Sequence, residues 1–245
     1  MAAWGAEAPP RPGPRPRLSI GDLAKAGVAL ADELGLEAVT MAKVADRVGF
    51  TPMSLYRYVG SKDELIQLMF DEMGRDLGVS AERAHGWRDG LESLAHALAD
   101  RYTEHPWAVD VPIAGVPTMP SQVAVMEYGL ELLVPEGLEP GEALGVLQLV
   151  AGFVRSHSAL VRDITRAATP GAALSPFSAA SSRLADLVDP AVMPRVAEAA
   201  RLGLLSPPAP DSAAADEELD DLRFGLDRIL DGVEVFIERR HTGQV

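Results

Sequence analysis

The stretch TMAKVADRVGFTPMSLYRYVGSKDEL, residues 40–65, decides the fold of this chain. Its pattern predicts two short helices joined by a tight turn. Thr40 is a good N-cap for a first helix over 41–48, because its hydroxyl can accept a hydrogen bond from a backbone N–H of the first turn. Gly49 ends that helix and supplies the small residue that a tight turn needs.

The second helix of the pair begins with Thr51 as N-cap and Pro52 at the first helical position, and we expect it to run to about Val59. In a helix-turn-helix the first short helix lies over the DNA backbone and the second enters the major groove. Ala45 is small where the two helices must approach closely. The apolar residues that fix their angle are Val44, Val48 and Leu55.

The outward side chains of this second helix have chemistry suited to DNA. Hydroxyl groups donate to phosphate oxygens, and Arg57 can either pair with a phosphate or fork onto guanine. Met53 can contact a thymine methyl group. Lys62 follows at the start of the next helix, where free backbone N–H groups also favour a phosphate. The hydroxyl-bearing candidates are Thr51, Ser54, Tyr56 and Tyr58.

Helices are also predicted on both sides of this pair. Ser19 is a good N-cap for a preceding helix that ends at Gly35. Ser61 caps a following helix through Leu77, and Glu64 three residues later completes a capping box. The apolar stripe of the preceding helix consists of Ile20, Leu23, Gly27, Leu30 and Leu34.

Charge is unevenly distributed along the 245 residues, whose net charge is −14. Residues 1–62 carry eight Lys or Arg against six Asp or Glu, a balance of +2, and the remainder carries −16. An acidic body would repel phosphate and favour one docking orientation of a DNA-binding end. Acidity also keeps a protein soluble, and the two readings are compatible.

Composition excludes several classes of protein. Cysteine is absent, which rules out disulfide frameworks and Cys-based zinc sites. No apolar run reaches the roughly 18 residues of a membrane helix, so we expect no membrane association and a cytoplasmic protein. Residues 1–17 are rich in Pro, Ala and Arg without the apolar segment of a secretory signal. We expect a disordered N-terminal arm; its alternative role is minor-groove contact.

Beyond Gly78 the pattern stays helical, and the helices lengthen. A long helix is predicted over 141–165, with one face formed by Leu144, Leu147, Ala151, Val154, Ser158 and Val161. Shorter helices are predicted over 121–134 and 190–202, and 105–120 should form a loop. The low-complexity segment 167–182 should be mobile. After a Pro/Ala linker, a last helix begins at Asp216, with a stripe of Leu219, Leu222, Leu226, Ile229, Val233 and Phe236.

The run over 40–65 resembles the DNA-binding motif of the tetracycline-repressor (TetR) family, and 19–70 as a whole fits that pattern. The portion LYRYV-x-SKDEL is highly specific to it. The resemblance implies phosphate contacts from Thr40, Tyr56, Tyr58 and Lys62. It implies base-edge contacts from among Pro52, Met53, Ser54 and Arg57.

The C-terminal half is similar to the ligand-binding domain of the tetracycline repressors. The segments that carry this similarity are HPWAVDVPIAG at 105–115, EYGLELL, GEALGVLQLVAG at 141–152 and FGLDRILDGVE at 224–234. The metal-chelating histidine of true tetracycline repressors would fall near Pro112, which cannot coordinate a metal. The resemblance therefore implies the fold and the regulatory logic without a magnesium–tetracycline ligand, and we expect no metal and no cofactor.

Several side chains of this half could line a ligand pocket, although each could equally serve the core or face solvent. Arg155 stands on an otherwise apolar helix, which makes it a candidate for an anionic group; its alternative is a salt bridge or a surface position. The candidates for ligand contact are His96, Trp107, Met126, Phe153, Arg155 and His157.

Together these features predict an all-α homodimer with three parts: an arm at 1–17, a three-helix DNA-binding domain at 18–78, and a helical-bundle ligand-binding and dimerisation domain at 79–245. The last helix and 141–165 would pair as a four-helix bundle. The two heads would meet half-sites of a pseudo-palindrome roughly 34–36 Å apart. We expect a repressor released by a small molecule, with an activator of the same fold as the alternative. No GxSxG, Walker, GxGxxG or metal-ligand motif points to an enzyme.

Overall fold

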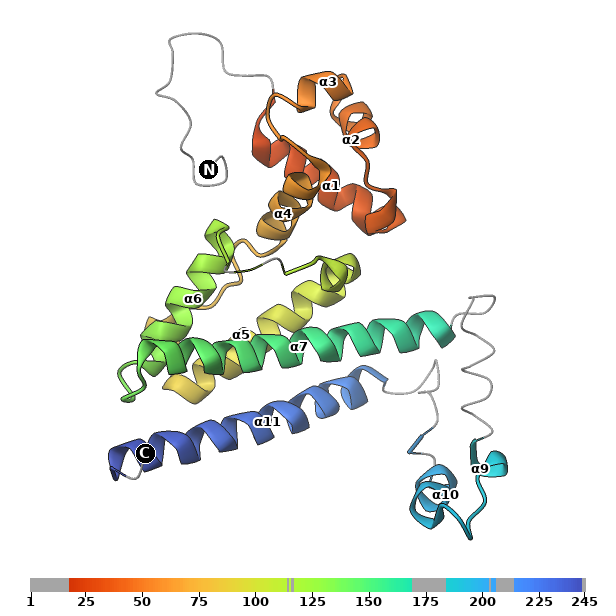
Figure 1. Ribbon diagram of the computed structural model, residues 1–245, viewed down its shortest axis with the longest axis vertical. Helices are drawn as coiled ribbons and strands as arrows, with labels where there is room; N and C mark the ends of the chain where they lie inside the picture. Colours follow the sequence, from red (N-terminus) through yellow and green to blue (C-terminus); the bar gives the residue numbers. More distant parts are fainter. Residues whose placement is uncertain are drawn as a thin grey trace. The chain divides into compact units, whose positions relative to one another are not determined.

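The computed structural model describes residues 18–113, 115, 117–168, 184–202, 204–205 and 214–243, and these residues form helices and no strand (Figure 1). The all-helical prediction is therefore confirmed. The predicted arm at 1–17, nearly all of the low-complexity segment and most of the Pro/Ala linker lie outside the described residues.

Two compact units divide the described residues. The first contains the residues from Leu18 to Arg155 together with those from Leu226 onwards, and the second contains the described residues between Ser156 and Gly225. The long helices α7 (Pro140–Ala168) and α11 (Ala214–His241) each belong partly to both. The domain boundary after residue 78 stays a prediction.

The N-terminal part of the first unit is built from helices α1 (Ile20–Leu34), α2 (Met41–Val48), α3 (Pro52–Leu55) and α4 (Lys62–Met73) (Figure 1). α1 packs closely on α4, where a Cβ at Gly27 would lie 2.6 Å from the Met69 sulfur. Only a glycine allows this approach without a shift of Met69. The core between these helices contains Leu23, Leu30, Val39, Val44, Leu55, Leu65 and Met69.

The predicted helix starts are confirmed more closely than the helix ends. The predicted cap at Ser19 is present, and the Asp22 carboxylate accepts a hydrogen bond from the Ser19 backbone N–H, which makes a full capping box. The third helix was predicted to reach Val59, but it ends at Leu55 and continues as a turn. The fourth was predicted to reach Leu77, but it ends at Met73. The ends of α1 and α2 are as predicted, because Gly35 and Gly49 stop these helices locally.

The rest of the first unit contains α5 (Trp87–Glu104), the 3-10 helix η4 (Pro106–Asp110), α6 (Pro120–Leu133) and the first part of α7. The predicted loop over 105–120 therefore holds a short helix, and its Trp107 and Val109 are buried. On α6, the Tyr128 hydroxyl donates to the Gly90 carbonyl of α5 at 2.9 Å, which ties these two helices together.

On the long helices α7 and α11, some buried residues lie one position away from the apolar residues predicted to be buried. On α7 the buried residues include Ala143, Val146, Leu147, Val150 and Val154, whereas Leu144 and Ala151 are half-buried. On α11 they are Leu222, Leu226, Leu230, Val233 and Ile237, whereas Ile229 and Phe236 are half-buried. The predicted Leu219 lies outside the described side chains. Both helices expose further apolar residues, so neither is covered all round by its own chain.

One described helix, the stretch Pro140–Ala167 of α7, is long and apolar enough to cross a membrane by length and composition. The expectation that no segment has this size therefore holds only for an uninterrupted run, because Gln148 and Arg155 divide this one. One face of the helix packs in the core of the first unit. A single helix of this length and composition is not by itself evidence of a membrane span.

The second unit contains two short helices besides the parts of α7 and α11. α10 (Pro194–Arg201) lies within the segment predicted as helical, while α9 (Leu184–Leu187) follows a stretch that gave no helical signal. The two pack against each other.

Candidate nucleic-acid interface

The turn between α2 and α3 is fixed by local hydrogen bonds. The Thr40 hydroxyl oxygen accepts from the Lys43 backbone N–H at 3.2 Å, so its own hydrogen stays available to donate. Gly49 has φ of 74° and ψ of 33°, the left-handed conformation that favours glycine. The Phe50 N–H then donates to the Ala45 carbonyl at 2.9 Å and closes the turn. The start of α3 is therefore held firmly against α2.

α3 has one anchored side and one free side. Leu55 is fully buried against the core, whereas Met53 is 78% exposed and Pro52 is also exposed. Thr51 forms no capping hydrogen bond, contrary to its predicted role; its hydroxyl shares a 2.9 Å hydrogen bond with the Ser54 hydroxyl. Because each hydroxyl has one hydrogen, this pair still offers a donor to an outside acceptor.

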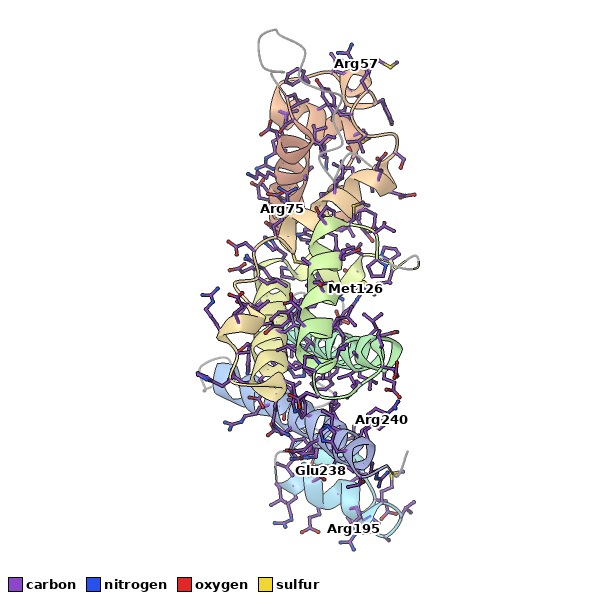
Figure 2. All side chains as sticks on the ribbon, turned by 90° about the vertical axis from the view of Figure 1, so that its left-hand side faces the viewer. Arg57, Arg75, Met126, Arg195, Glu238 and Arg240 are labelled. Carbon is purple, nitrogen blue, oxygen red and sulfur yellow. The ribbon has the colours of Figure 1, made fainter. Side chains whose placement is uncertain are left out.

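The turn after α3 carries the two tyrosines and the arginine. The Tyr58 N–H donates to the Leu55 carbonyl at 2.8 Å, and the Arg57 N–H donates to the Ser54 carbonyl at 3.3 Å. Tyr56 is 51% exposed, Arg57 is exposed and Tyr58 is half-buried. Figure 2 shows Arg57 pointing away from the neighbouring helices. The predicted DNA-facing side chains therefore stand on the surface, although the helix that carries them is shorter than predicted.

The cations of this region fall into two groups. Arg47 is engaged by Glu33, and its hydrogen bond holds the pKa of that carboxyl below its usual range. Lys25 lies 3.8 Å from Glu72. Within the described residues no ion pair engages the exposed cations Lys43, Arg57 and Lys62. These three remain available for phosphate oxygens.

Lys62 stands at the capped start of α4. The Ser61 hydroxyl accepts from the Glu64 N–H at 3.0 Å, as predicted. The Glu64 carboxylate, however, accepts from the Gly60 N–H at 2.7 Å, one residue before the cap itself. This double cap fixes the direction in which the chain enters α4 and hence the place of Lys62.

The structure thus brings all the predicted DNA contacts to one connected region of the surface, around the start of α2, α3 and the start of α4. The predicted set is Thr40, Thr51, Pro52, Met53, Ser54, Tyr56, Arg57, Tyr58 and Lys62. Sequence reasoning left out Lys43, whose position one turn after Thr40 was the available signal. The arrangement offers hydroxyl donors, exposed cations and one apolar tip, which suits a phosphate backbone with bases between.

The candidates for ligand contact are dispersed. His96 is exposed on α5, Met126 (Figure 2) and Phe153 are half-buried on α6 and α7, and His157 is half-buried in the second unit. Trp107 is buried, and its indole N–H donates to the Asp32 carboxylate of α1 at 2.7 Å. This side chain therefore has a structural partner in the DNA-binding helices.

Arg155 also has structural partners. Its guanidinium donates to the carbonyls of Val109 and Val111, through Nη2 at 2.7 Å and 2.6 Å and through Nε to Val109 at 3.2 Å. It therefore joins α7 to the end of η4. The two sequence-based alternatives, a salt bridge and a surface position, are both wrong for the described residues, because Arg155 is half-buried and bonds carbonyls.

A junction connects the DNA-binding helices to the rest of the first unit. Asp71 of α4 is 1% exposed, and its carboxylate accepts from the backbone N–H of Ser121 in the first turn of α6 at 2.8 Å. A carboxylate is favourable there because helix N-termini carry partial positive charge. Just before η4, His105 Nδ1 lies 2.9 Å from the same Asp32 oxygen that Trp107 binds. Neither carboxylate was among the predicted site residues.

Comparison with known families gives two matches that together span most of the chain. Residues 23–69 match the family described as bacterial regulatory proteins, tetR family. Residues 80–237 match the family described as tetracyclin repressor-like, C-terminal domain.

Relatives and solved structures agree with these matches. The HTH-type transcriptional repressor DrrR1 of Streptomyces coeruleorubidus is 33% identical over 97% of this chain and 85% of its own. An HTH-type transcriptional repressor of Mycobacterium tuberculosis is 25% identical over 93% of this chain and 87% of its own. Apo ActR of Streptomyces coelicolor superposes with a TM-score of 0.74 at 20% identity, covering 91% of this chain and 98% of that one. ActR has also been solved with actinorhodin bound.

Proposed function

Since this chain belongs to the tetracycline-repressor family, we propose that it is a transcriptional repressor that binds operator DNA and is released by a small molecule. The family is one of transcription regulators and not of enzymes. The observation that carries the proposal is the surface of α3, where Leu55 is buried while Met53, Tyr56 and Arg57 are exposed in the turns around it. A short helix that is anchored on one side, and whose free side and following turn carry Met53, Tyr56 and Arg57, is suited to a DNA groove.

Each exposed group has a proposed role. Phosphate contacts are assigned to Thr40, Lys43, Thr51, Tyr56, Tyr58 and Lys62. Base-edge contacts are assigned to Pro52, Met53, Ser54 and Arg57. Arg57 is the strongest candidate among these for reading sequence, because a guanidinium can bind guanine with two hydrogen bonds and this one has no competing carboxylate among the described residues.

Dimerisation would bring two DNA-binding surfaces together for a pseudo-palindromic operator. On the first-unit part of α7, Leu149 is 60% exposed, and on that of α11, Val235 is 44% exposed. Apolar side chains on two long helices favour packing against the same helices of a second copy as a four-helix bundle. Two heads would then contact half-sites roughly 34–36 Å apart.

Release of operator DNA by the ligand is explained by the contacts between the DNA-binding helices and the rest of the first unit. Asp71 joins α4 to the start of α6, and Asp32 joins α1 to η4 through Trp107. A ligand that binds among α5, α6 and α7 and prefers another placement of α6 or η4 moves the DNA-binding helices as well. Linkage then requires that ligand and operator weaken each other by the same factor.

The effector is proposed to be a small organic molecule, as the actinorhodin-bound structure illustrates for ActR. A magnesium–tetracycline complex is not proposed. The cytoplasm is the expected location, as for transcriptional repressors of this family in general.

The test is selection of bound fragments from genomic DNA by the full chain, with Arg57→Ala as the test variant and Arg83→Ala as its matched control. Arg83 is an exposed arginine on η3 (Ala81–Arg83), outside the proposed surface. The wild type and the control should enrich the same pseudo-palindrome, and Arg57→Ala should lose or change it. If no site is enriched at low salt, or if Arg57→Ala selects as the wild type does, the proposed reading surface is wrong.

A further inference from the structure

Arg155 has a guanidinium that is only partly used by its own chain. Nε and Nη2 bond the carbonyls of Val109 and Val111. Nη1 is shut off from solvent and has no hydrogen-bond partner among the described residues. A guanidinium carries donors on all three nitrogens, and a charged donor buried without an acceptor is costly. The free Nη1 therefore calls for an acceptor from outside.

The counter-ion of this arginine is missing as well. Other half-buried arginines of the first unit have carboxylate partners: Arg88 lies 2.8 Å from Asp231, and Arg240 is paired with Glu142. Arg155 forms no ion pair with any carboxylate in the described part of the chain, although the protein is strongly acidic. Its partners are two neutral carbonyls, so the positive charge stays uncompensated beneath the surface.

The residues near Arg155 in the chain and along η4 are mostly apolar, and one buried hydroxyl feels its charge. Val154 and Trp107 are buried beside the residues that it joins. Tyr102 is buried on α5; burial raises the pKa of its hydroxyl, and the Arg155 charge is near enough to oppose that rise. The phenol is therefore neutral at pH 7 and can donate a hydrogen bond. A mostly apolar site with a few polar groups is typical of small-ligand binding.

We propose that the effector carries an oxyanion, a carboxylate or an acidic phenol, that binds Nη1 of Arg155 and supplies the missing counter-ion. This inference rests on the proposed function and names the chemical class of its ligand. A charge-assisted hydrogen bond at this atom discriminates strongly between an acid and its neutral ester.

The same residue gives the ligand a route to the DNA-binding helices. Arg155 holds η4 through the Val109 and Val111 carbonyls, and η4 holds α1 through Trp107 and Asp32. An oxyanion at Nη1 draws the guanidinium toward itself and away from these carbonyls. Asp32 is then a positioning residue, which transmits binding without touching the ligand.

The probes are two matched pairs, 2-naphthoate with methyl 2-naphthoate and anthraquinone-2-carboxylate with its methyl ester, titrated calorimetrically into the full chain at neutral pH. The wild type should bind at least one acid about 10-fold or more tightly than its ester. Arg155→Met should abolish that preference, Arg155→Lys should keep part of it, and Arg83→Met should leave it unchanged. Equal binding of acid and ester by the wild type, including no binding of either, overturns the proposal, as does an unchanged preference in Arg155→Met.

If circular dichroism shows that Arg155→Met does not fold, two measurements test the proposal instead. These are the preference of the wild type for the acid over its ester and the reduction of that preference in Arg155→Lys. Asp32→Ala provides the second readout: it should bind the acid as the wild type does, yet the acid should no longer release operator, and Asp32→Asn should restore part of the release. Release from Asp32→Ala equal to that of the wild type contradicts the route through η4. Operator binding is measured separately, so a chain that selects no DNA defeats the proposed function without altering the comparison of acid and ester.

Discussion

The surface around α3 and the outer faces of α7 and α11 expose opposite kinds of side chain. Around α3 the exposed groups are mainly hydroxyls and unpaired cations, with Met53 as one apolar tip among them. On α7 and α11 the exposed groups include Leu149 and Val235. The first surface is formed by one chain and suits the charged backbone of DNA. The second exposes apolar side chains, which are stabilised when another apolar surface covers them. The same molecule therefore presents a polar contact and an apolar contact to two different partners.

The largest effect is expected from a charge placed on the exposed apolar face of α7. Leu149→Glu places a charge in the proposed dimer interface, so the chain should sediment as a monomer. Operator affinity should fall about 100-fold or more, because two linked heads gain roughly 10²–10⁴ over one. Leu34→Glu is the matched control, since Leu34 is 59% exposed against 60% for Leu149. A Leu149→Glu chain that remains dimeric in sedimentation contradicts the assignment.

Arg57→Ala tests whether the polar surface around α3 reads the DNA sequence. If Arg57 reads a base, the change should cost about 1–3 kcal/mol of operator binding and relax specificity at one position. Titrations against the selected site and its single-base variants measure both quantities. A uniform loss across all variants would assign Arg57 to the phosphate backbone instead.

Gly49→Ala tests whether local geometry fixes the polar surface. A residue with a side chain at φ of 74° costs roughly 1–2 kcal/mol, so urea unfolding should show a reduced free energy of unfolding. Gly21→Ala in α1 is the control, because its Cβ would meet only the Ser19 hydroxyl at an ordinary 3.7 Å. The control should be neutral or slightly stabilising, since alanine is the better helix former. Equal stability of the Gly49 variant and the wild type would contradict the strained-turn account.

Lys62→Ala should have a smaller and different signature. It removes one phosphate contact, so binding should weaken alike for all sequences, and the slope of log affinity against log salt should drop by about 1. Measurements at four salt concentrations with operator and unrelated DNA test this. An unchanged slope would show that Lys62 does not neutralise a phosphate.

The smallest effect concerns the ion pair that ties α7 to α11. The hydrogen bond from Arg240 and that from the Glu139 N–H hold the pKa of Glu142 below its ordinary 4.5. The pair therefore stabilises the fold above pH 4.5, and its contribution disappears as the pH falls through the lowered pKa. Glu142→Gln should flatten this part of the stability profile in urea unfolding, whereas Glu131→Gln, at an exposed position on α6, should leave it as in the wild type. Identical profiles for Glu142→Gln and the wild type would contradict the role of this pair.

Much of the DNA-binding surface could be predicted because its determinants are local. Thr40, Gly49 and Ser61 act within four residues of themselves, and the structure places each in its predicted role. The length of α3 could not be predicted this way, since burial of Leu55 and Val59 against the core sets the turn that follows it. The structural partners of Trp107 and Arg155 could not be predicted, because a lone tryptophan or arginine carries no local signal of its partner.

The sequence by itself determined the helical class, the caps at Ser19, Thr40 and Ser61 and the turn at Gly49, because a backbone hydrogen bond to a cap spans only three or four positions. Only the tertiary structure decided which contacts join α4 to α6 and α7 to η4. Asp71 meets Ser121 across 50 positions, and Arg155 meets Val109 across 46. Such pairs depend on how whole helices pack, and a carboxylate or guanidinium in the sequence is compatible with many partners until that packing selects among them.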